Sequence, residues 1–171
     1  VRGPAREIRE AIQVLYPEHG IKGEEYEDLN PNAAFTWIID PIDGTKGFLR
    51  GQQFALALGL VEGDEPIVGL LGCPHLSLGT AEDYGAADPS GSVYLGIVGE
   101  GAFAGDAQAS TLAALTPIKV SPEPPEGRVR VCLSYEKAHG DQDRTSAALE
   151  ATGVATTPIR IDSQCKYAMV A

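Results

Sequence analysis

The chain has 171 residues, 43% of them hydrophobic and 22% charged, and its 13 basic and 24 acidic side chains give a formal net charge of −11. A chain of this length can bury a sizeable core without disulfides, and its apolar runs are far shorter than the roughly 18 residues that cross a bilayer, which excludes disorder, fibres and a membrane span. The acidic balance opposes binding to nucleic acid polymers and anionic membranes, but carboxylates that hold divalent cations can still receive small phosphorylated molecules.

Residues 5–16 predict an amphipathic helix that Pro17 ends, because apolar side chains recur there at helical spacing between charged ones. Residues 20–23 predict a short strand or turn. Residues 35–39 predict a buried strand, since the run is compact and rich in β-branched side chains. Residues 43–45 then predict a turn into a short helix, because Asp and Thr suit N-terminal capping positions and Gly permits a tight entry.

The middle of the chain predicts an antiparallel sheet. Residues 54–61 and 67–73 flank an acidic, glycine-containing turn, and residues 92–98 and 101–104 flank another, so each pair reads as a hairpin. Three prolines within residues 121–127 mark the best domain boundary. We therefore expect an N-terminal α+β domain over residues 1–126, which contains the sheet and the metal-binding residues described below.

Residues 127–171 predict the beginning of a C-terminal α/β domain. Residues 129–134 and 158–161 are expected to form strands, and residues 145–152 a helix between them. Ser163 is a candidate N-cap for a further helix, in which the sequence stops.

The cysteines form an odd and widely spaced set, Cys73, Cys132 and Cys165, which matches neither a disulfide framework nor a metal-binding pair. Buried, reduced thiols and a reducing compartment are the expectation, and we predict a cytoplasmic protein. No targeting segment is visible. The sequence opens on Val1 rather than Met and stops at Ala171, so both ends look cut.

The stretch Asp40-Pro41-Ile42-Asp43-Gly44-Thr45 carries the strongest chemical signal. A buried strand that ends in one carboxylate and presents a second three residues later offers two hard oxygen ligands side by side, and the carbonyl of Ile42 can be a third. Gly44 and Thr45 offer backbone amides at a helix start, which suits a phosphate. The pattern thus predicts a divalent cation beside an anion site.

Asp-Pro and Asp-Gly are also ordinary turn dipeptides, so this stretch by itself would more often be a turn. The additional feature is Gly23-Glu24-Glu25, which follows its own short strand 16 residues before Asp40. A second strand end can bring Glu24 to the same ion. Glu25 is expected to face solvent or to lie behind the ligands.

These two segments resemble the metal-binding core of the inositol monophosphatase-like, metal-dependent phosphatases. Residues 46–51, 71–74, 136–139 and 162–167 are similar to the 3'(2'),5'-bisphosphate nucleotidase branch, while residues 17–21 resemble the inositol and histidinol phosphatase branches. The resemblance spans residues 20–171. It implies a layered α-β-α-β-α sandwich, an α/β fold of the inositol monophosphatase type that is incomplete at both ends.

The resemblance implies two or three Mg2+ ions. One ion would be bound by Glu24, Asp40 and the carbonyl of Ile42, and Asp40 and Asp43 would share a second. Glu24, Asp43 and Thr45 would form the catalytic set, with Thr45 orienting the attacking water. Two hard cations can activate water and neutralise phosphoryl oxygens, so no covalent nucleophile is required.

For the substrate, the resemblance implies that His139, Ser163 and Lys166 hold the adenosine and its second, 5' phosphate, next to Gly44 and Thr45. Taken alone, His139 reads as a loop histidine and Lys166 as a solvated helix lysine. Because Lys166 is one helical turn from Ser163, both can face one anion near the helix start.

The chain departs from the family at its ends. Family members usually supply a catalytic acidic residue from a segment before Val1 and a metal-binding Asp from a segment after Ala171. We therefore expect this chain to be an inactive fragment of an active enzyme.

The leading hypothesis is an Mg2+-dependent phosphatase that removes the 3'-phosphate of adenosine 3',5'-bisphosphate, with 3'-phosphoadenylyl sulfate as a further candidate substrate, in sulfur assimilation. The alternative within the same chemistry is an inositol or other sugar monophosphatase. A different class is a non-catalytic metal- or nucleotide-binding module. The expected partner is a small phosphorylated nucleotide, with no nucleic acid polymer and no membrane. The sequence leaves the oligomeric state open, with a monomer favoured.

Overall fold

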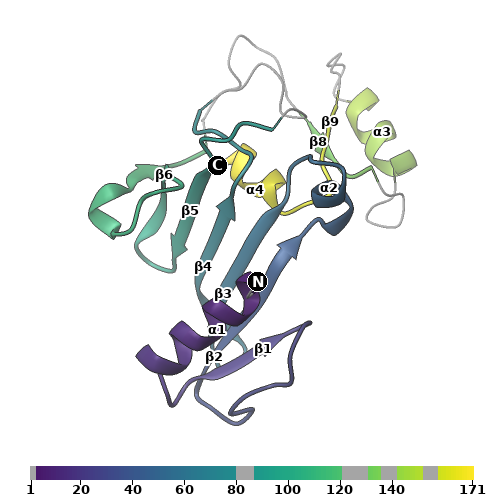
Figure 1. The fold of residues 1–171 in the computed structure, drawn as a ribbon. Coiled ribbons are helices and arrows are strands. Elements are labelled where there is room, and N and C mark those ends of the chain that lie inside the picture. The colour runs from purple at the N-terminus through teal and green to yellow at the C-terminus, as the bar shows by residue number, and fades with distance from the viewer. Residues whose placement is uncertain (1–2, 80–86, 121–130, 136–141, 152–157) are drawn as a thin grey trace.

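A computed structural model describes residues 3–79, 87–120, 131–135, 142–151 and 158–171. Its largest element is a sheet of seven strands that lie side by side in chain order (Figure 1). β1 pairs with β2 in parallel, and every later pair in this sheet is antiparallel. The strands are β1 (Gly20–Gly23), β2 (Phe35–Asp43), β3 (Ala55–Glu62), β4 (Glu65–Cys73), β5 (Ser92–Ile97), β6 (Gly101–Asp106) and β7 (Thr116–Ile118).

The helix α1 (Pro4–Leu15) covers one face of the sheet at β1 and β2. Pro4 suits the first helical turn because its missing N–H would have no partner there. Ile12 packs against Ile21 and Ile39 in a small core. Leu15, the last residue of the helix, is 69% exposed and does not share this core.

The segment after α1 packs through aromatic rings. His19 stacks on Tyr16 with ring centroids 4.9 Å apart, and its Nδ1 accepts a hydrogen bond from the indole of Trp37 at 3.0 Å. Trp37 lies in β2, so this bond ties the entry of β1 to the strand that leads to Asp40. His19 is therefore a packing residue.

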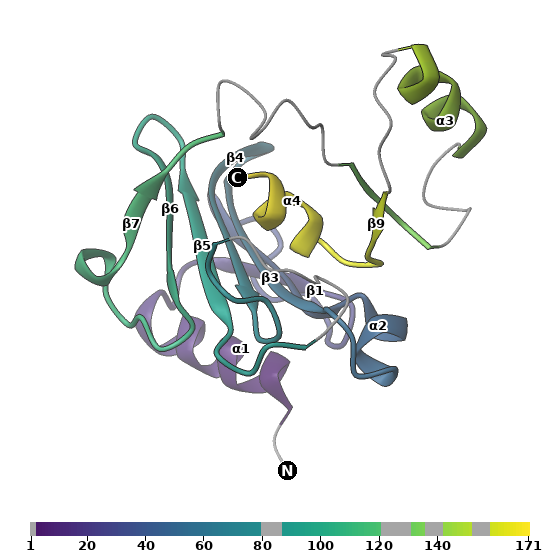
Figure 2. The ribbon, with the colours of Figure 1, turned by 90° about the horizontal axis from the view of Figure 1, so that it is seen from above.

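The remaining elements lie beyond the opposite face of the sheet (Figure 2). β8 (Cys132–Leu133) and β9 (Ile159–Arg160) pair in parallel, α3 (Gln142–Ala151) lies on their far side, and α4 (Cys165–Val170) lies between β9 and the large sheet. The short helix α2 (Thr45–Leu49) and the 3-10 turn η1 (Leu112–Ala114) complete the chain. This stacking of helices and sheets confirms the predicted α/β fold class.

Several predicted elements have different bounds. The helix expected over residues 145–152 begins at Gln142, and the strand expected over residues 129–134 is limited to Cys132–Leu133. η1 and β7 had no signal in the sequence. The proposed domain boundary at residue 126 lies outside the described residues.

All three thiols gather in one hydrophobic cluster, although the sequence places them far apart. Cys73 and Cys165 are buried and Cys132 packs partly buried against them. The thiol of Cys165 donates a hydrogen bond to the carbonyl of Phe54 at 3.2 Å. A hydrogen bond to Cys165, with burial adding to it, raises the pKa of Cys73. The three are free, as predicted.

Among the described residues, none of the helices is long and apolar enough to cross a membrane.

Candidate metal and phosphate site

The regular pairing of β2 with β3 is interrupted near the end of β2, between Asp40 and Asp43. β2 pairs in register with β3 up to Asp40, and the register shifts before Asp43. Pro41 has no N–H to contribute to a ladder, which favours such an irregularity. Oδ1 of Asp40 accepts a hydrogen bond from the backbone N–H of Ile42 at 3.2 Å. The irregularity therefore lies between the two aspartates, at the end of β2.

Gly44 makes the turn from β2 into α2. Its φ of 83° lies in the left-handed region, where a side chain costs free energy. The predicted capping by Asp43 or Thr45 is absent, since α2 has no side-chain hydrogen bond at its N-cap, which is Gly44 itself. The hydroxyl of Thr45 instead donates to the carbonyl of Ile42 at 3.1 Å. That carbonyl keeps a second lone pair that can serve as a ligand.

A cavity of about 340 Å³ opens at this turn. Both strand ends, the turn and the start of α4 contribute to its wall. It is lined by Glu24, Asp40, Ile42, Asp43, Gly44, Thr45, Lys46, Asp162, Ser163, Gln164 and Lys166. The set includes four carboxylates and two lysines, so the cavity offers ligands for hard cations and positive charge for an anion.

A second, larger hollow of about 630 Å³ adjoins the first between α4 and the open face of the sheet. Its wall is mostly apolar, with Leu58, Leu70 and Phe103 among the lining side chains. Asp40 and Asp43 line both hollows and so lie where they meet. A phosphate needs polar donors or cations around it, so the smaller, polar cavity is the candidate site.

The charges in the cavity are not balanced. Burial, with the nearby charge of Asp40 adding to it, raises the pKa of Asp43 above its ordinary value, although a hydrogen bond from Gln164 works in the opposite direction. Within the described part of the chain, no three His, Cys, Asp or Glu side chains converge closely enough to enclose a metal ion. Like charges in one site repel each other unless a cation lies between them.

The donors nevertheless fit Mg2+ in kind. Carboxylate and carbonyl oxygens are its preferred ligands, and Mg2+ usually keeps several waters rather than taking a closed protein cage. Asp40, Asp43 and the carbonyl of Ile42 lie within four residues of chain at one bulge, and Glu24 reaches the same cavity from β1. An open site of this composition suits a hydrated hard cation, and the Mg2+ ligand set remains a prediction.

The start of α4 closes the cavity on the side opposite β1. The backbone N–H of Gln164 donates a hydrogen bond to Oδ2 of Asp43. Gly44 lies so close to this segment that a Cβ on it would stand 2.6 Å from the carbonyl oxygen of Asp162 and from Cβ of Ser163. The contact between the turn and α4 therefore requires glycine at position 44.

Ser163 is buried and lines the cavity. It was predicted as the N-cap of α4, but the helix begins one residue later and Gln164 occupies the N-cap. The hydroxyl of Ser163 still accepts a hydrogen bond from the backbone N–H of Cys165 at 3.1 Å. It thus stabilises the first turn much as a capping side chain does.

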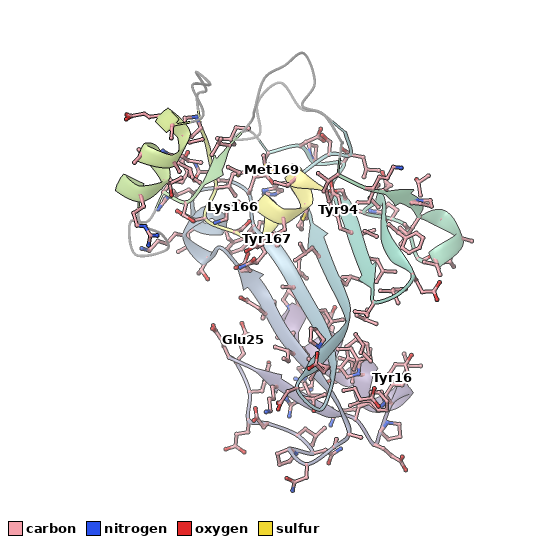
Figure 3. The ribbon with its side chains drawn as sticks, turned by 180° about the vertical axis from the view of Figure 1, so that it is seen from behind. Tyr16, Glu25, Tyr94, Lys166, Tyr167 and Met169 are labelled. Carbon is pink, nitrogen blue, oxygen red and sulfur yellow. The ribbon has the colours of Figure 1, made fainter. Side chains whose placement is uncertain are left out.

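Lys166 lies on the side of α4 that faces β8, while Glu25 lies beyond the β1 end of the sheet (Figure 3). Nζ of Lys166 donates a hydrogen bond to the hydroxyl of Ser134 at 2.6 Å. This partner is neutral, so it does not neutralise Lys166, whose charge also acts on Asp43 and opposes the rise in the pKa of that carboxyl. Glu25 is exposed and does not line the cavity, as expected.

A buried carboxylate connects α2 with the second sheet. Oδ1 of Asp162 accepts a hydrogen bond from the backbone N–H of Tyr135 at 2.7 Å, and Oδ2 lies 3.9 Å from Nη1 of Arg50. The guanidinium of Arg50 also lies over the ring of Tyr135, 6.0 Å from its centroid. Arg50 follows α2, so this network connects the end of α2 with Asp162, which lines the cavity.

The structure brings nearly every predicted site residue into one cavity. The exception is His139, which lies outside the described residues. Sequence reasoning missed Lys46, Asp162 and Gln164, which line the cavity, and Ser134, which contacts Lys166. The first three are sequence neighbours of predicted site residues, and this proximity could have indicated them. Ser134 stands at the end of a very short strand and had none.

Comparison with known proteins shows the family to which the chain belongs. The family model described as "Inositol monophosphatase family" matches residues 5–171. A 3'(2'),5'-bisphosphate nucleotidase of Dictyostelium discoideum is 39% identical over 152 residues, covering 88% of this chain and 43% of that protein. 3'(2'),5'-bisphosphate nucleotidase 1 of Arabidopsis thaliana is 40% identical over 140 residues, covering 77% and 38%.

Among solved structures, the extragenic suppressor protein suhB of Bartonella henselae superposes with a TM-score of 0.70 at 19% identity, covering 98% of this chain and 58% of that one. The chain therefore belongs to the inositol monophosphatase family. It spans about two fifths of the length of the nucleotidases that it matches.

Proposed function

We propose that the protein to which this chain belongs is a phosphatase that removes the 3'-phosphate of adenosine 3',5'-bisphosphate, with Mg2+ as cofactor. The observation that carries the proposal is that Glu24, Asp40, Asp43 and Lys166 all line one polar cavity. Two relatives that are 39% and 40% identical over the aligned residues are named 3'(2'),5'-bisphosphate nucleotidases, which supports a bisphosphate nucleotide as the substrate.

Mg2+, when bound, supplies activation of water and neutralisation of phosphoryl charge. Glu24, Asp40, Asp43 and the carbonyl of Ile42 are the groups that would hold it. The backbone amides of Gly44 and Thr45 would face the phosphoryl oxygens, since they begin α2 at the cavity wall. The hydroxyl of Thr45 already donates to the carbonyl of Ile42, so its oxygen is held in place with a lone pair left to orient water.

Selection of a bisphosphate requires positive charge at a distance from the cations. Lys166 provides this charge on the α4 side of the cavity, and Ser163 lies beside it. His139 is proposed to contact the nucleoside. A monophosphate lacks the group that Lys166 would bind, so the lysine favours substrates with two phosphates.

An inositol or other sugar monophosphatase is the second candidate. The observation in its favour is the fold, which superposes on inositol monophosphatases such as that of Anabaena with a TM-score of 0.65 at 23% identity. It would use the same carboxylates, and Lys166 would then have no anionic partner in the substrate.

Phosphate release measured on the whole protein decides between the candidates. The substrates are adenosine 3',5'-bisphosphate, 3'-phosphoadenylyl sulfate and inositol 1-phosphate, each with Mg2+ and with EDTA. We expect the highest kcat/KM for the bisphosphate and no release in EDTA. A preference for inositol 1-phosphate would establish the alternative. Tight binding of the nucleotide without hydrolysis would instead establish a binding module.

A further inference from the structure

Ser134 forms a side-chain hydrogen bond with Lys166, the lysine of α4 that lines the cavity. Its hydroxyl accepts the 2.6 Å hydrogen bond from Nζ of Lys166, and its carbonyl accepts a hydrogen bond from Nη1 of Arg160 at 3.0 Å. Lys166 lines the cavity, whereas Ser134 does not. Of the two side chains bonded to Ser134, Lys166 is the one that lines the cavity, so the direct contact between Ser134 and the cavity runs through Lys166.

The position of Ser134 is itself fixed from both sides. The residue before it, Leu133, accepts a backbone hydrogen bond from Ile161 at 2.9 Å. The residue after it, Tyr135, donates its backbone N–H to buried Asp162 at 2.7 Å. Both partners belong to the segment that leads directly into α4. The hydroxyl of Ser134 is thus held at a set distance from the helix that carries Lys166.

We propose that Ser134 is a positioning residue that sets the selectivity for substrates with a second phosphate, by holding Lys166 in its cavity-facing arrangement before the ligand binds. This inference rests on the proposed function, because it takes adenosine 3',5'-bisphosphate as the ligand. A free lysine side chain loses rotamer entropy when it is ordered. A hydrogen bond made beforehand to a neutral hydroxyl removes part of that cost and leaves the charge available.

The test is a double-mutant cycle read by binding. Isothermal titration calorimetry on the whole protein in EDTA, where no metal-dependent turnover occurs, gives the affinities for adenosine 3',5'-bisphosphate and adenosine 3'-monophosphate. The variants are Ser134→Ala, Lys166→Ala and the double variant. Ser134→Thr keeps the hydroxyl. Ser90→Ala is the matched control, because it removes an exposed hydroxyl that bonds only Asp88 and lies outside the cavity wall.

We expect Ser134→Ala to lower the ratio of bisphosphate to monophosphate affinity about 3- to 10-fold, the range of one hydrogen bond. In the Lys166→Ala background the same change is expected to have no further effect, because the proposal has Ser134 act through the lysine. Ser134→Thr is expected to restore the ratio, and Ser90→Ala to leave it at the wild-type value.

Three results would overturn the inference. The first is that Ser134→Ala lowers the ratio of bisphosphate to monophosphate affinity by the same factor in the wild type and in Lys166→Ala, which would indicate a merely structural role. The second is an unchanged ratio in Ser134→Ala, and the third is a wild-type protein without any preference for the bisphosphate. Hydrolysis is measured separately with Mg2+. If coupling is present but no phosphate is released from the bisphosphate, the proposed function fails while the role of Ser134 stands.

Discussion

The backbone N–H of Gln164 donates a hydrogen bond to the carboxylate of Asp43, which lies 121 residues earlier in the chain. This bond joins the bulge at the end of β2 to the first residues of α4. The bond thereby holds the carboxylates that would bind cations in place relative to the lysine that would bind an anion. Changes on either side of the bond are expected to alter both.

Gly44→Ala tests the close contact between the turn and α4. Alanine at a φ of 83° is strained, and its Cβ would overlap the carbonyl oxygen of Asp162 at 2.6 Å. We expect a loss of about 2 to 4 kcal/mol in the free energy of unfolding. Gly51→Ala is the matched control, because Gly51 also has a positive φ of 68° but nothing within 4 Å of its Cβ position, and it should cost only about 1 kcal/mol. Urea denaturation measures both, and equal losses would refute the contact.

Asp43→Asn tests the raised pKa of Asp43. The folded chain holds this proton more tightly than the unfolded chain does, so its contribution to stability is present below the ordinary aspartate pKa of about 3.9 and is lost as pH rises through the higher pKa of the folded state. In EDTA at pH 7 the variant is therefore expected to be more stable than the wild type, and the difference should vanish below about pH 4.

With added Mg2+ at pH 7 the wild type should become more stable than Asp43→Asn. Only the wild type retains the full ligand charge, and a bound ion stabilises the folded state. Urea denaturation at several pH values, with EDTA and with Mg2+, provides the measurement. A wild type that is more stable than Asp43→Asn in EDTA at pH 7 would contradict this account of the cavity's charge.

The thiols should differ in reactivity. Cys73 and Cys165 are 1% and 0% exposed, and the raised pKa of Cys73 leaves it with little thiolate at neutral pH. Cys132 is only half-buried. Ellman's reagent on the native protein is therefore expected to modify Cys132 first and the other two only as the protein unfolds. Simultaneous reaction of all three thiols would show that the cluster is open.

Lys166→Ala tests substrate selection. A cation paired with a phosphate in a partly desolvated site contributes about 1.5 to 3 kcal/mol, or roughly 10- to 150-fold. We expect the ratio of kcat/KM for adenosine 3',5'-bisphosphate to that for a simple monophosphate to fall by this factor. Steady-state kinetics on the whole protein provide both values. Equal losses on the two substrates would make Lys166 structural and would favour the inositol-type alternative.

The local parts of the site were predictable from the sequence, and the long-range parts were not. Asp40 and Asp43 end a recognisable strand, and a proline between them predicts the break in pairing, so their placement follows from neighbours in the chain. The bond from Gln164 to Asp43 uses a backbone N–H, which every residue except proline has, and therefore left no signal in the side chains.

The contact between Ser134 and Lys166 was hidden for a related reason. β8 is two residues long, too short for hydrophobic alternation to show which side chains share a face. The clustering of three widely spaced cysteines was likewise invisible, because spacing in sequence says little about distance when strands from two sheets meet.

The most direct test of the account is a crystal structure of the whole protein with Mn2+ in place of Mg2+ and with phosphate, read from the anomalous scattering of the ion. We expect at least one Mn2+ peak within about 2.0 to 2.5 Å of carboxylate oxygens of Asp40 and Asp43, with phosphate beside the amides of Gly44 and Thr45, and we expect that peak to be lost in Asp40→Asn. Ions bound elsewhere, or a peak that persists unchanged in Asp40→Asn, would contradict the assignment of this cavity as the metal and phosphate site.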